Sequence, residues 1–162
     1  MDASVYCKAD VSEQRAARPR HPIKLAPRCF VRDYIWMDQK LFEAGLEVRK
    51  ATLGKEFVEN AIASADDFNR PLQEFVTEYC WGACWTRPGL PRKTRSMLNL
   101  AMLTALNRPH ELKMHLKGAL TNGVSRDEIR EILLQTGVYC GVPAAVDAFR
   151  TAKEVFAELD KK

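Results

Sequence analysis

Apolar side chains recur with a helical period of about 3.6 residues along most of the chain, from residue 38 to residue 159. The first stripe predicts a helix that ends near Gly54, because glycine is a common residue at a helix end. A second, shorter helix follows it. The stripes that define these two helices are Leu41, Ala44, Val48 and Ala51, and then Phe57, Val58, Ala61 and Ile62.

A third helix is predicted by apolar positions at the spacing of a helix with one face in a core. These positions are Leu72, Phe75, Val76, Tyr79, Cys80 and Ala83. Two prolines and a glycine then predict a loop over residues 87–91. The following helix, from Pro91 to about Asn107, is apolar nearly all round, so we expect it to be the central, buried helix.

Three more helices complete the pattern. One spans about residues 110–121 and ends at Asn122-Gly123, a common stop signal. Ser125 and Glu128 form a capping box that begins the next helix, with a core face of Ile129, Ile132, Leu133 and Thr136. Gly141 and Pro143 separate it from a last helix, which is marked by Val146, Phe149, Ala152, Phe156 and Leu159.

The predicted architecture is all-α, because no strand-like alternation competes with the helical pattern. We expect a single-domain bundle of about six to seven helices over residues 36–162. Residues 1–35 are predicted to be a basic N-terminal arm, because Pro19, Pro22 and Pro27 and the lack of an apolar period disfavour a stable helix there.

Composition and charge exclude several classes of protein. No apolar run is long enough to span a bilayer and the N-terminus lacks a signal peptide, so a cytoplasmic protein without a membrane partner is expected. The net charge of +4 falls mostly in residues 1–37, which leaves too little basic surface to suggest nucleic-acid binding. Five cysteines, an odd number in such a chain, indicate reduced thiols.

A cationic stretch is the first candidate for chemistry, because no acidic residue occurs between Glu78 and Glu111. Four basic residues lie around the 87–91 loop and the start of the next helix: Arg87, Arg92, Lys93 and Arg95. A helix N-terminus already attracts anions, and guanidinium groups there predict a carboxylate-binding corner. Arg87 and Arg95 are our candidates for substrate binding. The alternative is that these charges are solvated or lie at a subunit interface.

Glu111 and His115 lie four residues apart, so they share one face of the predicted helix. They border its apolar stripe, where the wall of a cleft would lie. The carboxylate is expected to raise the pKa of the imidazole and so produce an acid near neutral pH. We interpret the two as a catalytic pair. The alternative is a surface pair that contributes about a few tenths of a kcal/mol to helix stability.

Trp81 is a candidate wall of a substrate pocket, although tryptophans more often lie in a core or an interface. Cys80, Cys84 and Cys140 are interpreted as buried, small hydrophobic side chains, because the helical spacing of the first two is too wide for a disulfide. No metal site is expected. The imidazoles of His110 and His115 would point about 140° apart on a helix, so they would not share a metal.

Four motifs, WTRPGL, LTALNR, ELKMH and YCGVPAA, occur in this order between Trp85 and Ala145. In these motifs and their spacing the chain resembles the carboxymuconolactone decarboxylase family of the alkylhydroperoxidase D superfamily. The resemblance covers about residues 38–159. It implies an alkylhydroperoxidase D-like helical subunit that assembles into a homo-oligomer, with a hexamer built from trimers as the expected form.

The resemblance also implies a decarboxylation that needs no cofactor. A dicarboxylate lactone, 4-carboxymuconolactone, would be converted to 3-oxoadipate enol-lactone in the protocatechuate branch of the β-ketoadipate pathway. The alkene and carbonyl of the lactone ring accept the electrons that CO2 leaves behind. Arg87 and Arg95 would anchor the side-chain carboxylate, and Trp81 would help to exclude water. His115, oriented by Glu111, would stabilise the oxyanion or donate the proton.

One departure from a pattern of the superfamily bears on the activity. Peroxidase-type members carry an asparagine, a Cys-x-x-Cys pair and a histidine. Asn107 and His115 match that pattern, but Arg108 and Glu111 occupy the two cysteine positions, and the redox glutamate is replaced near Ser96. A thiol-type peroxidase is therefore disfavoured. The sequence leaves open a related decarboxylase for another lactone and a non-catalytic oligomeric protein that binds an aromatic acid.

Overall fold

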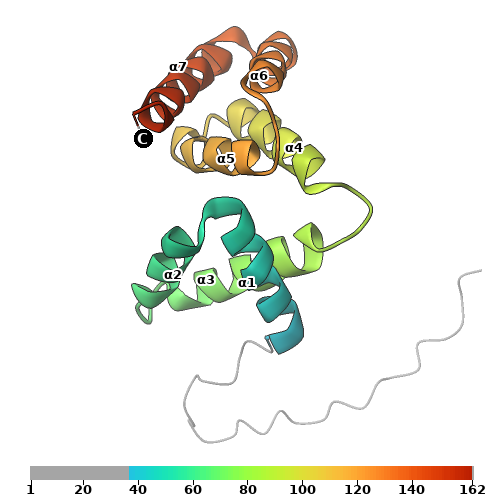
Figure 1. Cartoon of the computed structure of the whole chain (residues 1–162), viewed down its shortest axis with the longest axis vertical. Coiled ribbons are helices and arrows are strands. Elements are labelled where there is room, and N and C mark those ends of the chain that lie inside the picture. Colours follow the sequence, from blue (N-terminus) through green and yellow to red (C-terminus); the bar gives the residue numbers. More distant parts are fainter. Residues whose placement is uncertain (1–36, 162) are drawn as a thin grey trace, which may run out of the picture. The chain divides into compact units, whose positions relative to one another are not determined.

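The computed structural model of the protein describes residues 37–161, and every regular element in this range is a helix. Figure 1 shows them in order from blue to red: α1 (Gln39–Leu53), α2 (Lys55–Ala63), α3 (Arg70–Phe75), η1 (Val76–Trp85), α4 (Arg92–Ala105), α5 (Pro109–Thr121), α6 (Arg126–Cys140) and α7 (Val142–Leu159). Seven are α-helices, and η1 is a π-helix. The predicted all-α fold class is confirmed. The predicted arm of residues 1–35 lies outside the described residues.

Local capping groups set both ends of α1. The Asp38 side chain accepts hydrogen bonds from the backbone N–H groups of Lys40 and Leu41, at 2.9 and 3.1 Å. At the C-terminal end Gly54 has φ 96°, a backbone conformation that glycine adopts without a steric penalty. The predicted end of this helix at Gly54 is confirmed.

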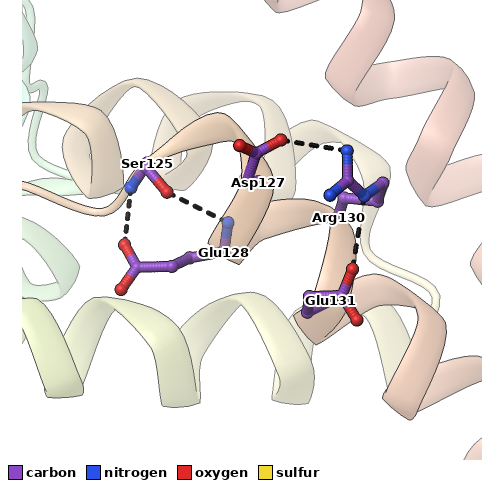
Figure 2. Close-up of polar contacts among 5 residues, drawn as sticks. All are labelled: Ser125, Asp127, Glu128, Arg130 and Glu131. Carbon is purple, nitrogen blue, oxygen red and sulfur yellow. Dashed lines mark hydrogen bonds and ion pairs between the residues drawn. The ribbon is translucent and has the colours of Figure 1, made fainter.

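Figure 2 shows the capping box at the start of α6. The backbone N–H of Ser125 donates to Glu128 Oε2 at 2.7 Å, and the N–H of Glu128 donates to Ser125 Oγ at 3.1 Å. The bonds satisfy two N–H groups that lack partners inside the helix, and they confirm the predicted box. Arg130 pairs nearby with Asp127 and Glu131 on the exposed surface, where each pair contributes less than about 1 kcal/mol.

The main apolar core lies among α4, α5, α6 and α7. One side chain from each of these helices is completely buried there: Leu100, Leu116, Leu133 and Val155. Burying each such side chain contributes about 1.5–3 kcal/mol. Helices α6 and α7 pack closely, since a Cβ on Gly137 would come within 2.8 Å of the Ala145 Cβ.

Helices α1 and η1 make a different contact, in which their backbones touch. A Cβ on Gly45 would lie 2.5 Å from the backbone nitrogen of Gly82, and a Cβ on Gly82 would lie 2.3 Å from the carbonyl oxygen of Leu41. Only glycine permits backbones to approach this closely. A second apolar cluster lies at this contact and consists of Val48, Trp81 and Trp85.

The predicted core face of the third helix is mostly wrong, although Val76 is partly buried against the second cluster. Leu72, Phe75 and Tyr79 are about half exposed. The buried positions are instead Thr77, Glu78, Trp81, Gly82 and Trp85. The α-helical backbone ends at Phe75 and continues as the π-helix, whose hydrogen bonds span five residues and not four. The α-helical period therefore assigns the wrong side chains to the buried face.

The predicted stripe of α1 is also partly wrong, because Ala44 and Ala51 are exposed. The buried face is rotated by about one residue and consists of Gly45, Val48, Arg49 and Thr52. The contact with η1 explains this rotation. It requires the face that contains glycine, although that face also carries a charged side chain.

Helix α4 is less buried than predicted in the part of the chain that the structure describes. Its buried residues are Ser96, Leu100 and Thr104, whereas Leu98 and Met102 are about half exposed. The exposed side lines an apolar groove of about 480 Å³ between α4 and α6. One face of this apolar helix therefore remains uncovered by the described chain.

The ends of the last helices agree with the sequence pattern. Helix α5 covers Pro109–Thr121 and is followed by Asn122 and by Gly123 at φ 84°. Gly141, at φ 117°, separates α6 from α7 as predicted.

Within residues 37–161 we find no helix with the length and apolar character needed to cross a membrane.

Candidate active site

A cavity of about 470 Å³ brings together residues from α1, η1, α4 and α5. Most of its wall is aromatic or aliphatic, and a few polar groups point to specific recognition. The wall includes Arg49, Trp81, Trp85, Asn99, Met114 and His115. Two of the candidates from the sequence, Trp81 and His115, therefore lie in one cavity.

The imidazole of His115 lies beside a pair of tryptophans. The His115 ring lies nearly parallel to the Trp81 ring, with 6.3 Å between centroids and an interplanar angle of 5°. Trp81 in turn contacts Trp85 at a centroid distance of 4.6 Å, and both indoles are buried. The Trp81 indole therefore lies alongside the imidazole in the cavity wall.

Partial burial has the largest influence on the protonation of His115. It lowers the pKa of the imidazole below its ordinary value of 6.5, and the charge of Glu111 opposes this shift without overcoming it. Glu111 does raise the pKa of His115, as expected, but Glu111 is exposed and acts mainly through solvent, so the effect of burial is larger. The predicted imidazole acid near neutral pH is therefore wrong. At neutral pH the imidazole is uncharged and offers one N–H donor.

The two arginines expected to anchor a carboxylate are not among the residues that line this cavity. Arg95 donates to the backbone oxygen of Arg87 at 3.0 Å and to Cys84 Sγ at 3.6 Å. Arg87 itself is exposed. Because Cys84 belongs to the cavity wall, Arg95 lies just outside it and ties the 87–91 loop to η1.

Arg49 is a wall residue that the sequence pattern did not single out. Only 6% of its surface is exposed. Its Nη1 donates to Thr77 Oγ1 at 2.8 Å and its Nη2 donates to Gln73 Oε1 at 2.9 Å. Arg49 follows Gly45 by one helical turn, so the two share the face of α1 that packs against η1. The spacing of Gly45 and Arg49 predicts a buried cation only if the glycine face of α1 is known to be buried, and the sequence does not show that.

The cysteines of η1 are not the buried, small hydrophobic side chains that we predicted. Cys80, Cys84 and Cys140 are exposed, and the first two line the cavity. The π-helical register turns Cys80 and Cys84 away from the core, whereas Cys140 lies at the end of α6. Partial burial raises the pKa of the Cys80 thiol, and Arg49 lowers it by less.

In residues 37–161 no group of three or more potential ligands is arranged to hold a metal ion.

These features define a small-molecule pocket in an all-helical fold, with an uncharged imidazole, a buried guanidinium and a wall that is largely apolar. Residues 70–154 match the model of the "Carboxymuconolactone decarboxylase family". This chain belongs to the carboxymuconolactone decarboxylase family, as the sequence motifs predicted. The matched segment contains Trp81 and His115 but begins after α1, so Arg49 lies outside it.

Two relatives cover most of the chain. It is 43% identical to 4-carboxymuconolactone decarboxylase of Acinetobacter baylyi over 122 residues, which are 75% of this chain and 91% of the relative. It is also 43% identical to nitrosuccinic acid decarboxylase npaB of Metarhizium robertsii over 126 residues, which are 78% of this chain and 88% of the relative. Both relatives are named as decarboxylases.

Proposed function

We propose that this chain is a carboxy-lyase that converts 4-carboxymuconolactone to 3-oxoadipate enol-lactone without a cofactor. Membership of the family and the name of the Acinetobacter relative support the reaction. The observation that carries the proposal is the neutral imidazole of His115 beside Trp81 in a cavity large enough for a small lactone. The proposed pathway is the protocatechuate branch of aromatic degradation.

The substrate supplies its own electron sink. When the bond to the departing carboxylate breaks, CO2 leaves and the electron pair moves through the ring alkene onto the carbonyl oxygen of the lactone. The resulting dienolate then takes one proton on carbon, which restores the carbonyl. The protein must therefore bind the substrate, stabilise the oxyanion and allow the proton to reach carbon.

His115 is suited to the second of these tasks. An uncharged imidazole donates one N–H, and a donor already positioned in the cavity wall stabilises a developing oxyanion more strongly than water, which has to reorient. A general acid would have to be protonated beforehand, which the lowered pKa of His115 opposes at neutral pH. We therefore propose oxyanion stabilisation as its role. Glu111, four residues away, contributes a weaker electrostatic influence on the imidazole.

Trp81 and the arginines of the loop take supporting roles in this proposal. Trp81 orients the imidazole and excludes water from the reacting carbons. Arg87 and Arg95, next to the wall residue Cys84, attract the dianionic substrate to the cavity. Because neither arginine lines the cavity, we favour attraction over the direct anchoring that the sequence suggested.

Turnover by the purified full-length chain tests the proposal. The expected result is loss of enzymatically prepared 4-carboxymuconolactone with release of CO2. His115→Ala should lower kcat by about 100-fold or more, the scale for losing one oxyanion donor, while circular dichroism stays unchanged. His110→Ala, on the exposed side of the same helix, should retain activity. Wild-type turnover in His115→Ala would remove the imidazole from the mechanism, and binding without turnover would favour a non-catalytic binding protein.

A second candidate substrate is nitrosuccinic acid, because the Metarhizium relative is equally similar to this chain. This compound is also a dicarboxylic acid, and its nitro group stabilises the carbanion that CO2 loss creates, as the enone does in the lactone. The ratio of kcat/KM for the two compounds separates the candidates. A large preference for nitrosuccinic acid would replace the lactone in our proposal but would leave the reaction type unchanged.

The exposed thiols on the cavity wall favour testing the thiol-type peroxidase as well. The raised pKa of Cys80 makes it a poor nucleophile at neutral pH, which argues against that activity. Because both thiols line the cavity, alkylation would obstruct it. The sharper test is the double variant Cys80→Ser and Cys84→Ser, which should decarboxylate at nearly the wild-type rate.

We also propose that the chain works in the cytoplasm as a homo-oligomer, and specifically as a hexamer. The uncovered apolar faces of α4 and α6 support an assembly, with Leu98, Met102 and Tyr139 exposed along the groove between them. Light scattering after size-exclusion chromatography should give a mass near six times 18.4 kDa. Met102→Glu should shift that mass downward, and a monomeric wild type would contradict the proposal.

A further inference from the structure

Arg49 is a buried cation without an anionic partner among the described residues. Its two hydrogen-bond acceptors, Thr77 Oγ1 and Gln73 Oε1, are both uncharged. Within residues 37–161 no carboxylate oxygen lies within 4.0 Å of its guanidinium. The Arg49 Nε is shielded from solvent and has no hydrogen-bond acceptor among the described residues. Buried charges are normally paired, so this arrangement points to a missing anion.

The neighbouring thiol does not supply that anion. Cys80 is the one group whose charge favours the protonated form of Arg49, but burial raises the pKa of this thiol, so it is neutral at pH 7. Burial also lowers the pKa of Arg49, yet a guanidinium remains protonated in proteins under ordinary conditions. The positive charge is therefore present and uncompensated within the described wall.

The place for an anion is the cavity itself. Arg49 lies in the same wall as His115 and Trp81, and it is the one permanently charged side chain among the described residues that line this cavity. The remaining lining groups are apolar, aromatic or neutral polar side chains. A ligand that enters this cavity thus meets one fixed cation and one neutral imidazole, both of which suit an organic acid.

We propose that Arg49 binds the carboxylate that the substrate keeps, and that it makes the site selective for dicarboxylic acids. This inference rests on the proposed decarboxylation. A cation paired with the departing carboxylate would stabilise the charge that has to leave it and so would slow the reaction. The retained carboxylate has the same charge before and after CO2 is lost, so holding it positions the lactone near His115 at no such cost.

The test combines a protein change with a substrate change. In the wild type, kcat/KM for the dicarboxylate lactone should exceed that for its derivative with the retained carboxylate as a methyl ester. Arg49→Gln should lower kcat/KM for the diacid by about 10- to 100-fold, the scale of one charged hydrogen bond, mainly through KM. The same variant should have little effect on the ester, so the preference for the diacid should disappear.

Two further variants separate ligand binding from a structural role. Arg49→Lys keeps a cation and should retain part of the preference for the diacid. Thr77→Val removes one hydrogen bond from Arg49 but leaves its charge, so it should change stability more than the preference. Arg150→Gln, which breaks an exposed pair on α7, is the matched control and should behave as the wild type.

The outcomes distinguish the two proposals. If the wild type turns over the lactone and Arg49→Gln retains both its KM and its preference for the diacid, the role of Arg49 is overturned and the function stands. If the wild type turns over neither lactone nor nitrosuccinic acid, the proposed function fails. Calorimetric titration with succinate, a simple dianion, then still reports whether Arg49→Gln weakens the binding of a dicarboxylate.

Discussion

The α1–η1 pair and the α4–α7 core are stabilised in different ways. Among α4 to α7, interlocking aliphatic side chains such as Leu100, Leu116 and Leu133 are completely buried. Between α1 and η1, the backbones meet at Gly45 and Gly82, and the buried side chains nearby include polar and charged groups. The first arrangement maximises apolar burial. The contact between α1 and η1 buries less apolar surface, because polar and charged side chains occupy part of it.

This difference coincides with the position of the candidate active site, because α1 and η1 supply much of the cavity wall. Buried polar groups such as Arg49 and Glu78 lower stability unless a partner compensates them. Arg49 lies in the cavity wall with Trp81 and His115, and Glu78 lies on the same π-helix as Trp81. The apolar core provides the stability that allows α1 and η1 to keep an open cavity with a charge on its wall. We therefore expect stability and activity to respond to changes in different helices.

The largest expected effect on stability is in the apolar core. Leu133→Ala removes a completely buried side chain from α6 and should lower the free energy of unfolding by about 2–5 kcal/mol. Chemical denaturation monitored by circular dichroism measures this loss. The kcat of the folded variant should stay close to that of the wild type. A large fall in kcat would show that the core and the site are not separable.

The contact between backbones should tolerate no added methyl group. Gly82→Ala places a Cβ 2.3 Å from the carbonyl oxygen of Leu41, so α1 and η1 must move apart, at a cost of about 1–3 kcal/mol. Because the same helices carry Arg49 and Trp81, kcat/KM should fall as well. Gly89→Ala, in the loop where a Cβ meets nothing within 4 Å, is the control. Unchanged activity in Gly82→Ala would break the link between this contact and the site.

The pH dependence should reveal the partly buried imidazole of His115. If neutral His115 is the active form, kcat/KM falls as the pH is lowered, with a midpoint below 6.5 because burial lowers the pKa of His115. The free energy of unfolding should decrease over the same range, since the unfolded chain takes up this proton first. His115→Gln should lack this contribution in both measurements. An activity that rises on acidification would indicate a protonated imidazole and a general-acid role.

The smallest effect is expected from the exposed arginine of the loop. Arg87→Ala should raise KM by about two- to five-fold with little change in kcat, because a solvent-exposed charge contributes less than about 1 kcal/mol. The increase should diminish at high salt, where such an attraction is screened. Steady-state kinetics at two ionic strengths measure it. A loss as large as that in Arg49→Gln would contradict the contrast between buried and exposed arginines.

Much of the candidate site could be proposed from the chain alone. The motifs between Trp85 and Ala145, one of which ends at His115, indicated the family. His115 and the candidate Trp81 lie in one cavity. Arg49 could not be recognised, because the apolar stripe of α1 pointed to a face that includes Ala44 and Ala51, which are exposed. The pKa of His115 could not be predicted either, since Glu111 is visible in the sequence while the extent of burial is not.

Local signals in the sequence determined the helical class, the family and the helix ends at Gly54, Ser125 and Gly141, because caps and glycine conformations depend on residues that are neighbours in the chain. Tertiary structure alone decided which face of α1 and η1 is buried, because that choice depends on Gly45 meeting Gly82, residues far apart in sequence. The same contact buries a guanidinium in the cavity wall, where charge and shape together define what the site accepts.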